Sequence, residues 1–92
     1  MKIGMVGLGK MGKNMVLRLV RGGHDVIGWN ITPEPVAEIV KEGASGAKNL
    51  VDLVGQLPAP RVVWVMVPSG DPTEETIRNL AGLLSAGDVV VD

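Results

Sequence analysis

Three glycines stand at a spacing that suits phosphate binding, in the run Gly7-Leu8-Gly9-Lys10-Met11-Gly12. The run follows an apolar segment, Lys2–Val6, and precedes a segment with helical periodicity, which is the context that a G-x-G-x-x-G motif requires. Gly7 would allow a tight turn, Gly9 would let a pyrophosphate approach the backbone, and Gly12 would let helix and strand pack closely. The helix would direct its unpaired N–H groups at the phosphates. The motif therefore predicts a dinucleotide-binding loop formed by Gly7, Leu8, Gly9, Lys10, Met11 and Gly12.

Segments with strand character alternate with segments of helical periodicity along the whole chain. We expect strands at Lys2–Val6, Asp25–Trp29, 45–47, 61–67 and Val89–Val91. The run Val-Val-Trp-Val-Met-Val within 61–67 is typical of a central strand that is buried on both faces. The alternation predicts an α/β fold, a Rossmann-type doubly wound parallel sheet with strand order 3-2-1-4-5, truncated after strand five.

Side-chain types also predict local features of the helices. Thr32 can cap the second helix with Pro33 at its first position, and Asn49 can cap the third helix. We expect Met11 to pack in the core with the other apolar residues of the first helix. His24 follows a Gly-Gly turn, so we expect it on a solvent-exposed loop rather than in a catalytic site.

The carboxyl ends of strands one, two and four meet at one edge of such a sheet, where ligands bind. Besides the glycine run, the candidate cofactor-binding residues at this edge are Asn30, Ile31, Thr32, Val67, Pro68 and Ser69. An NAD site usually carries Asp or Glu about 20 residues beyond the glycines. Asn30 stands there without a negative charge, so it would not repel the 2′-phosphate of NADP, to which Thr32 could donate a hydrogen bond. Because Ile31 occupies the place where NADP sites often carry arginine, both NADP and NAD stay open, with a slight preference for NADP.

Composition limits the classes of protein that the chain can belong to. Its 92 residues suit one small domain, and a net charge of −1 gives no reason to expect nucleic acid or a membrane surface as a partner. The absence of cysteine excludes disulfides, thiolate catalysis and cysteine metal sites, and we expect no bound metal. Lys10 and Lys13 interrupt the first apolar stretch, which argues against a signal peptide or membrane span. We therefore expect a cytoplasmic location.

Several longer segments resemble one enzyme family. They are residues 13–19 (Lys-Asn-Met-Val-Leu-Arg-Leu), 42–47 (Glu-Gly-Ala-Ser-Gly-Ala), 60–70 (Pro-Arg-Val-Val-Trp-Val-Met-Val-Pro-Ser-Gly) and 87–92 (Gly-Asp-Val-Val-Val-Asp). With the glycine run, they resemble the N-terminal NAD(P)-binding domain of decarboxylating 6-phosphogluconate dehydrogenases, within the β-hydroxyacid dehydrogenase superfamily. The resemblance covers essentially the whole chain.

The resemblance implies an oxidoreductase of the pentose phosphate pathway. Such an enzyme oxidises the 3-hydroxyl of 6-phosphogluconate and releases carbon dioxide to give ribulose 5-phosphate. By this resemblance, residues 7–12 would hold the pyrophosphate, 30–32 the adenosine end and 67–69 the path toward nicotinamide. Asn30 resembles the NADP branch of the family, whereas Pro68 resembles the often NAD-preferring branch, because the NADP branch tends to carry lysine there.

The resemblance also indicates what residues 1–92 lack. The lysine and glutamate that act as base and acid in the family have no counterpart here, since Lys10, Lys13, Lys41 and Lys48 match none of the catalytic positions. We expect residues 1–92 to form the dinucleotide-binding domain, without the helical substrate domain and without catalytic residues. We therefore expect the chain alone to be inactive and to associate into a homo-oligomer, since its last strand would lie at a sheet edge.

Two alternative functions stay open. A 3-hydroxyisobutyrate-type β-hydroxyacid dehydrogenase shares the glycine loop and the first helix, although Pro60-Arg61 favours the 6-phosphogluconate branch. A non-enzymatic module that senses dinucleotides is the second alternative.

Overall fold

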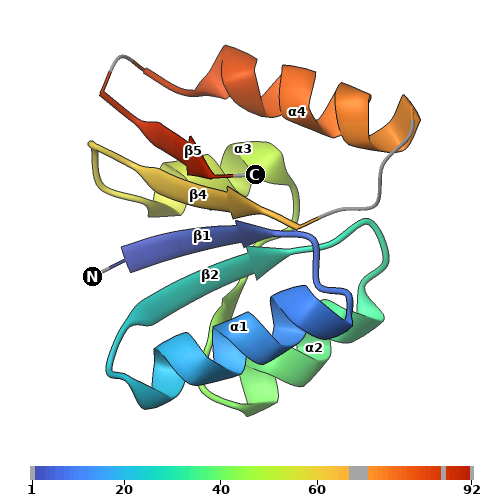
Figure 1. The fold of residues 1–92 in the computed structure, drawn as a ribbon, viewed down its shortest axis with the longest axis vertical. Helices are drawn as coiled ribbons and strands as arrows, with labels where there is room; N and C mark the ends of the chain where they lie inside the picture. The colour runs from blue at the N-terminus through green and yellow to red at the C-terminus, as the bar shows by residue number, and fades with distance from the viewer. Residues whose placement is uncertain (1, 67–70, 86, 92) are drawn as a thin grey trace.

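The computed structural model describes residues 2–66, 71–85 and 87–91, in which strands and helices alternate (Figure 1). The elements are β1 (Lys2–Val6), α1 (Lys10–Arg21), β2 (Asp25–Trp29), α2 (Glu34–Lys41), β3 (Ser45–Gly46), α3 (Leu50–Gln56), β4 (Val62–Val65), α4 (Asp71–Leu83) and β5 (Val89–Val91). The alternation predicted from the sequence is confirmed.

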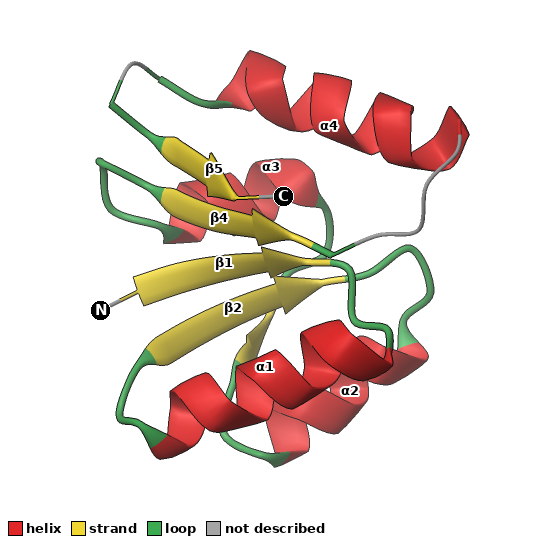
Figure 2. Cartoon of the chain, in the orientation of Figure 1, coloured by secondary structure: helices red, strands yellow, loops and turns green. Residues whose placement is uncertain are grey.

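All five strands form one parallel sheet in the order β3-β2-β1-β4-β5. β1 lies at the centre, where Met5 is paired with Gly28 of β2 on one side and with Trp64 of β4 on the other. Figure 2 shows the arrowheads of β1, β2, β4 and β5 pointing the same way, so their carboxyl ends share one edge. The predicted doubly wound sheet and its strand order are confirmed.

Two apolar layers separate the helices from the sheet. On the face covered by α1 and α2, Met5 and Val26 pack with Val16 and Ile39. The other face of the sheet is covered by α3 and α4. There Val6 and Ile27, the residues that follow Met5 and Val26 in their strands, pack in one cluster with Leu50, Leu53 and Leu80. Each fully buried side chain of this size contributes about 1.5–3 kcal/mol to folding. Packing of the core therefore restrains the strand ends that carry the candidate site.

One ion pair ties together the amino ends of β4 and β5, away from the carboxyl ends. The Asp88 carboxylate accepts from the backbone N–H of Arg61 (2.6 Å) and of Ser85 (2.8 Å), and it pairs with Arg61 Nη1 at 3.2 Å. Arg61 Nε also donates to the carbonyl of Val54 at 3.1 Å. The hydrogen bond from the Arg61 backbone, followed by that from Ser85, lowers the pKa of Asp88. We call Arg61 and Asp88 the amino-end clasp.

Two strand predictions were too long. β3 ends at Gly46 rather than residue 47, and β4 spans Val62–Val65 within the predicted 61–67. Val63 and Val65 are buried, whereas Val62 and Trp64 are only partly buried, so this strand is less completely covered than its apolar run predicted.

The start of α2 also differs from the prediction. The helix begins at Glu34, with Pro33 at the cap position and no side-chain cap, so Thr32 does not cap it. The oxygens of Thr32 instead accept hydrogen bonds from the Asn30 side chain. Asn49, in contrast, caps α3 as predicted, since its side chain accepts from Asp52 N at 2.8 Å.

Two side chains of the first helix and its following turn are placed differently from the prediction. Met11 is 70% exposed, because the buried face of α1 runs through Gly12 and Val16 rather than through Met11. His24 is half-buried rather than exposed, since its backbone N–H donates to the carbonyl of Leu19 and folds the turn back onto the helix end. Within the described ranges, no helix is both long enough and apolar enough to cross a membrane.

Candidate functional site

The carboxyl ends of the three central strands are joined by backbone hydrogen bonds that continue the sheet by one residue. Gly7 N donates to the carbonyl of Trp29 at 2.8 Å, and Met66 N donates to the carbonyl of Val6 at 2.7 Å. These bonds hold the carboxyl ends of β1, β2 and β4 at one edge, as predicted. The site is therefore built on backbone that is hydrogen-bonded to the sheet.

The three glycines of the loop have three different environments. Gly7 has a φ of +97°, a conformation that favours glycine and turns the chain from β1 toward α1. A Cβ on Gly9 would meet nothing within 4 Å, so the chain passes here through open space. A Cβ on Gly12 would lie 2.3 Å from the carbonyl oxygen of Gly7, so the helix packs against the loop as closely as backbone allows. The predicted turn at Gly7 and close packing at Gly12 are confirmed.

The first turn of α1 leaves backbone donors open. The cap residue Gly9 makes no side-chain capping bond, and no acidic residue lies in the first turn. Lys13 N is satisfied by the carbonyl of Gly9 at 2.8 Å, which begins the helical pattern. The backbone N–H groups before Lys13 take no part in the i to i−4 hydrogen bonds of the helix, and they lie at the positive end of the helix dipole. An anionic group at this position would be stabilised by both.

A cleft of about 720 Å³ runs over this loop. It is lined by Gly7, Leu8, Gly9, Lys10, Met11, Gly12, Asn30, Ile31, Pro35, Val65 and Met66. The structure thus brings together all six predicted loop residues with Asn30 and Ile31. Thr32 lies next to them and contacts Asn30 through its side chain. Val67, Pro68 and Ser69 lie outside the described residues.

Asn30 connects the two predicted binding segments. Its Oδ1 accepts from Leu8 N in the glycine loop at 2.9 Å, and its Nδ2 donates to Thr32 Oγ1 at 2.9 Å. Leu8 itself is buried, with its side chain in the core near Gly28. The position of the loop backbone therefore depends on a side chain 22 residues away.

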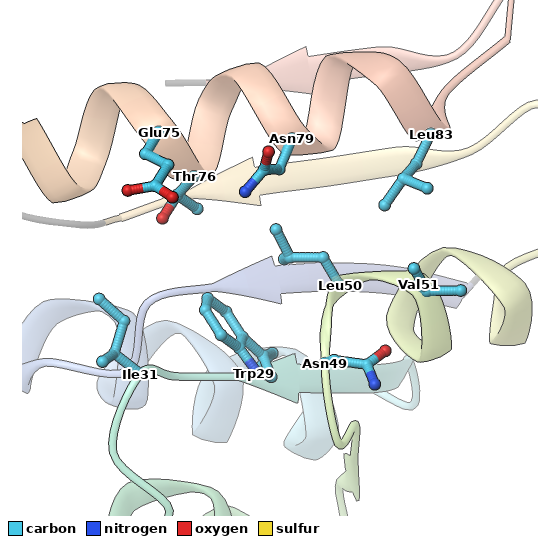
Figure 3. Close-up of a pocket in the computed structure, with 9 residues that line it drawn as sticks. All are labelled: Trp29, Ile31, Asn49, Leu50, Val51, Glu75, Thr76, Asn79 and Leu83. Carbon is cyan, nitrogen blue, oxygen red and sulfur yellow. The ribbon is translucent and has the colours of Figure 1, made fainter.

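A second cleft, of about 570 Å³, opens beside Ile31 on the face of α3 and α4 (Figure 3). Trp29 and Leu50 form its apolar floor, while Asn79 and Thr76 reach toward it from α4. Its lining residues are Trp29, Ile31, Asn49, Leu50, Val51, Glu75, Thr76, Asn79 and Leu83. Ile31 lines both clefts, and it is 63% exposed.

Sequence reasoning missed much of this lining. The residues Pro35, Val65 and Met66 of the first cleft, and those from α3 and α4 in the second, carry no motif. The one available signal was Trp29, a large aromatic residue at the last position of β2, whose carboxyl end lies at the site.

Charged groups near the loop are few. Lys13 of α1 forms an ion pair with Glu38 of α2, which links the two helices. For Lys10, at the start of α1, no ion pair is found within the described ranges. Among the same residues, no three His, Asp or Glu side chains are grouped so that they could hold a metal.

Comparison with known proteins gives a consistent result. Residues 2–92 match the family described as the NAD binding domain of 6-phosphogluconate dehydrogenase. Over 92 residues the chain is 39% identical to the NAD(+)-dependent, decarboxylating 6-phosphogluconate dehydrogenase of Haloferax volcanii. The match covers all of this chain and 31% of that protein.

Two solved structures share the fold at similar quality. The 6-phosphogluconate dehydrogenase of Plasmodium falciparum, described in complex with NADP+ and with 6-phosphogluconate, matches with a TM-score of 0.88 and 29% identity. The 3-hydroxyisobutyrate dehydrogenase of Mycobacterium tuberculosis matches with a TM-score of 0.85 and 25% identity. These matches cover 98% and 97% of this chain but only 21% and 30% of the other chains. The chain thus spans less than a third of each of these relatives.

Proposed function

The chain belongs to the family of NAD binding domains of 6-phosphogluconate dehydrogenase, and from this premise we propose that its glycine loop holds NAD or NADP for the oxidative decarboxylation of 6-phosphogluconate. The observation that carries the proposal is the open backbone at Gly9 beside the uncapped first turn of α1. A pyrophosphate placed there accepts hydrogen bonds from backbone N–H groups without meeting a side chain.

The two clefts suit the two ends of such a ligand. The cleft of Figure 3 is lined by five apolar side chains and by the polar side chains of Asn49, Glu75, Thr76 and Asn79, a combination that suits a flat adenine ring with polar edges. Ile31 lines both this cleft and the cleft over the loop, and Asn30 lines the latter, so the adenosine ribose would pass beside these two residues. The nicotinamide would then extend over Met66 toward Val67, Pro68 and Ser69.

The cofactor, when bound, supplies a hydride acceptor. The residues of this chain bind and orient it, so that one face of the nicotinamide is presented to the substrate. A proton acceptor must reach the substrate hydroxyl directly or through one water. Because the family supplies this group from a lysine that has no counterpart in residues 1–92, we assign it, together with the substrate domain, to a part of the enzyme beyond these residues.

Both cofactors are supported by relatives. The name of the Haloferax protein specifies NAD, whereas the Plasmodium structure is described with NADP+. Oxidation of a 3-hydroxyisobutyrate-type substrate is the second candidate activity, supported by the close structural match of the Mycobacterium tuberculosis enzyme. Either activity uses the same binding loop.

Replacement of Gly9 by valine tests the binding proposal. The side chain enters open space in the structure, so the fold should persist, but it fills the place of the pyrophosphate. Two lost charge-assisted hydrogen bonds at about 1.5 kcal/mol each would weaken binding by about 100-fold or more. The dissociation constants for NAD and NADP are measured by isothermal titration calorimetry.

Gly55→Val is the matched control. Gly55 is exposed, and a Cβ there would also meet nothing within 4 Å, but this glycine lies on α3 and lines neither cleft. We expect this variant to bind like the wild type. Equal affinity of the Gly9→Val and Gly55→Val variants would contradict the assignment of the loop.

A further inference from the structure

The sulfur atoms of this chain all belong to methionine. The chain has five methionines and no cysteine, so no thiol competes with the thioethers for an oxidant. Met5 is fully buried in the core, and Met15 and Met66 are half-buried against the same apolar cluster. Met11, in contrast, is 70% exposed. Because susceptibility to oxidation follows exposure, an oxidant in solution reaches Met11 first among the described methionines.

Met11 lies where the candidate site is open. It belongs to the glycine run and to the first turn of α1, and it lines the cleft over the loop. It also lines a groove of about 400 Å³ on α1, formed by Met11, Asn14, Met15, Leu17, Arg18 and Arg21. The thioether is therefore open both to a small oxidant and to a nucleotide in the cleft. Since the side chain is largely outside the core, a change in its polarity leaves the packing of the domain intact.

We propose that Met11 is an oxidation site, at which conversion of the thioether to the sulfoxide by a peroxide weakens the binding of dinucleotide by the glycine loop. The inference rests on the proposed function. The sulfur attacks one oxygen of hydrogen peroxide, so that an S–O bond forms and the O–O bond breaks. The sulfur is oxidised by two electrons and the peroxide is reduced. The proton of the transferred oxygen passes to the departing hydroxide, which leaves as water.

The new oxygen stands at the end of α1 that attracts negative charge. A sulfoxide is polar and its oxygen accepts hydrogen bonds, whereas a thioether sulfur is only a weak acceptor. Gly9 has no side chain that could cap the helix, and the first turn holds no acidic residue. The sulfoxide oxygen would therefore compete with a pyrophosphate for the backbone N–H groups there, and its partial negative charge would repel the phosphates. Loss of one charge-assisted hydrogen bond corresponds to about tenfold weaker binding.

Peroxide treatment of the wild-type chain tests this effect directly. Peptide mass spectrometry gives the fraction of sulfoxide at each methionine, and calorimetry gives the dissociation constant for NAD before and after treatment. We expect Met11 to be oxidised first and the dissociation constant to rise by about tenfold. Methionine sulfoxide reductases specific for the two sulfoxide epimers should then restore the original value. Circular dichroism establishes that the treated chain is folded.

Two leucine variants identify the methionine responsible. Met11→Leu keeps a side chain of similar size without the sulfur, and each sample is compared with its own untreated portion. This variant retains both tryptophans and the other methionines, so damage at any of them would still appear. Met15→Leu is the matched control, since Met15 lies one helical turn further along α1 and does not line the cleft over the loop. We expect the tenfold response to disappear in Met11→Leu and to persist in Met15→Leu.

The outcomes discriminate between this inference and the proposed function. Complete conversion of Met11 to the sulfoxide with an unchanged dissociation constant would overturn the inference and leave the proposed function intact. The same holds if Met15 or Met66 is oxidised ahead of Met11, or if treated Met11→Leu loses affinity as the wild type does. Absence of binding by the untreated, folded wild-type chain would overturn the proposed function and this inference together. A tenfold loss that the reductases reverse, and that requires Met11, is the supporting result.

Discussion

Gly12→Ala places a methyl group directly against the backbone of the glycine loop. The Cβ would lie 2.3 Å from the carbonyl oxygen of Gly7 and 3.2 Å from its carbonyl carbon. Neither atom belongs to a flexible side chain. Gly7 is held by its bond to the Trp29 carbonyl and by a φ of +97°, so the loop cannot yield without losing sheet pairing or its turn. The substitution must therefore separate α1 from the end of β1.

The expected change in the free energy of unfolding is the difference of two opposing contributions. Forcing a methyl group into a closely packed site costs about 1–3 kcal/mol, and a clash with fixed backbone belongs at the upper end of that range. Alanine in place of glycine inside a helix raises the free energy of unfolding by about 1 kcal/mol. We therefore expect Gly12→Ala to lower the free energy of unfolding by about 2 kcal/mol. For a small domain this is a large share of a total of about 5–15 kcal/mol.

Urea unfolding followed by circular dichroism measures this change. With a slope of about 1–2 kcal/mol per molar urea, the midpoint should fall by about 1–2 M. Gly82→Ala is the control, since a Cβ there meets nothing within 4 Å on the exposed side of α4. The same substitution should raise stability at Gly82 by about 0.5–1 kcal/mol. Two midpoints that move in the same direction would refute the packing argument.

The amino-end clasp and the link between α1 and α2 give further predictions. Asp88→Asn should lower the urea midpoint, because the Asp88 side chain is only 1% exposed and three hydrogen bonds depend on its charge. The pKa of Asp88 is lowered on folding, so its contribution is complete above about pH 4 and is lost as the pH falls through the folded-state pKa; unfolding midpoints at about pH 2–7 should show this loss in the wild type and less of it in Asp88→Asn. Lys13→Ala should change stability by less than about 1 kcal/mol in the same assay, since both members of the Lys13–Glu38 pair are exposed; a loss as large as that of Asp88→Asn would contradict this.

The sequence predicted the elements best where local chemistry decides them. β1, β2 and β5 were predicted with their observed bounds, because charged residues, glycine or asparagine delimit short apolar runs. The strand order followed from the alternation of strands and helices, since parallel crossovers with right-handed connections leave few arrangements. Asn49 was recognised as a cap because its donor partner lies only three residues away.

The wrong predictions for Thr32 and Met11 concern side chains whose surroundings the helical pattern alone does not reveal. Thr32 has the side chain of a helix cap, but Asn30 occupies its oxygens, and Asn30 is itself held by Leu8. Met11 has the spacing of a core residue, but Gly12 and Val16 take the buried positions of α1 and leave Met11 exposed. Likewise, the cleft of Figure 3 forms only where α3 and α4 approach the end of β2, and no local pattern encodes that approach.

The two tryptophans lie where their fluorescence can report on different parts of the domain. Trp29 packs against the core on the face of α3 and α4 and lines the cleft beside Ile31, whereas Trp64 packs against the core of the other face. The fluorescence of each indole therefore depends on the packing of a different face of the sheet. A protein with Trp64→Phe would emit from Trp29 alone, at the edge where a nucleotide is proposed to enter. Occupancy of the cleft could then be followed by fluorescence quenching, without a dye and without turnover.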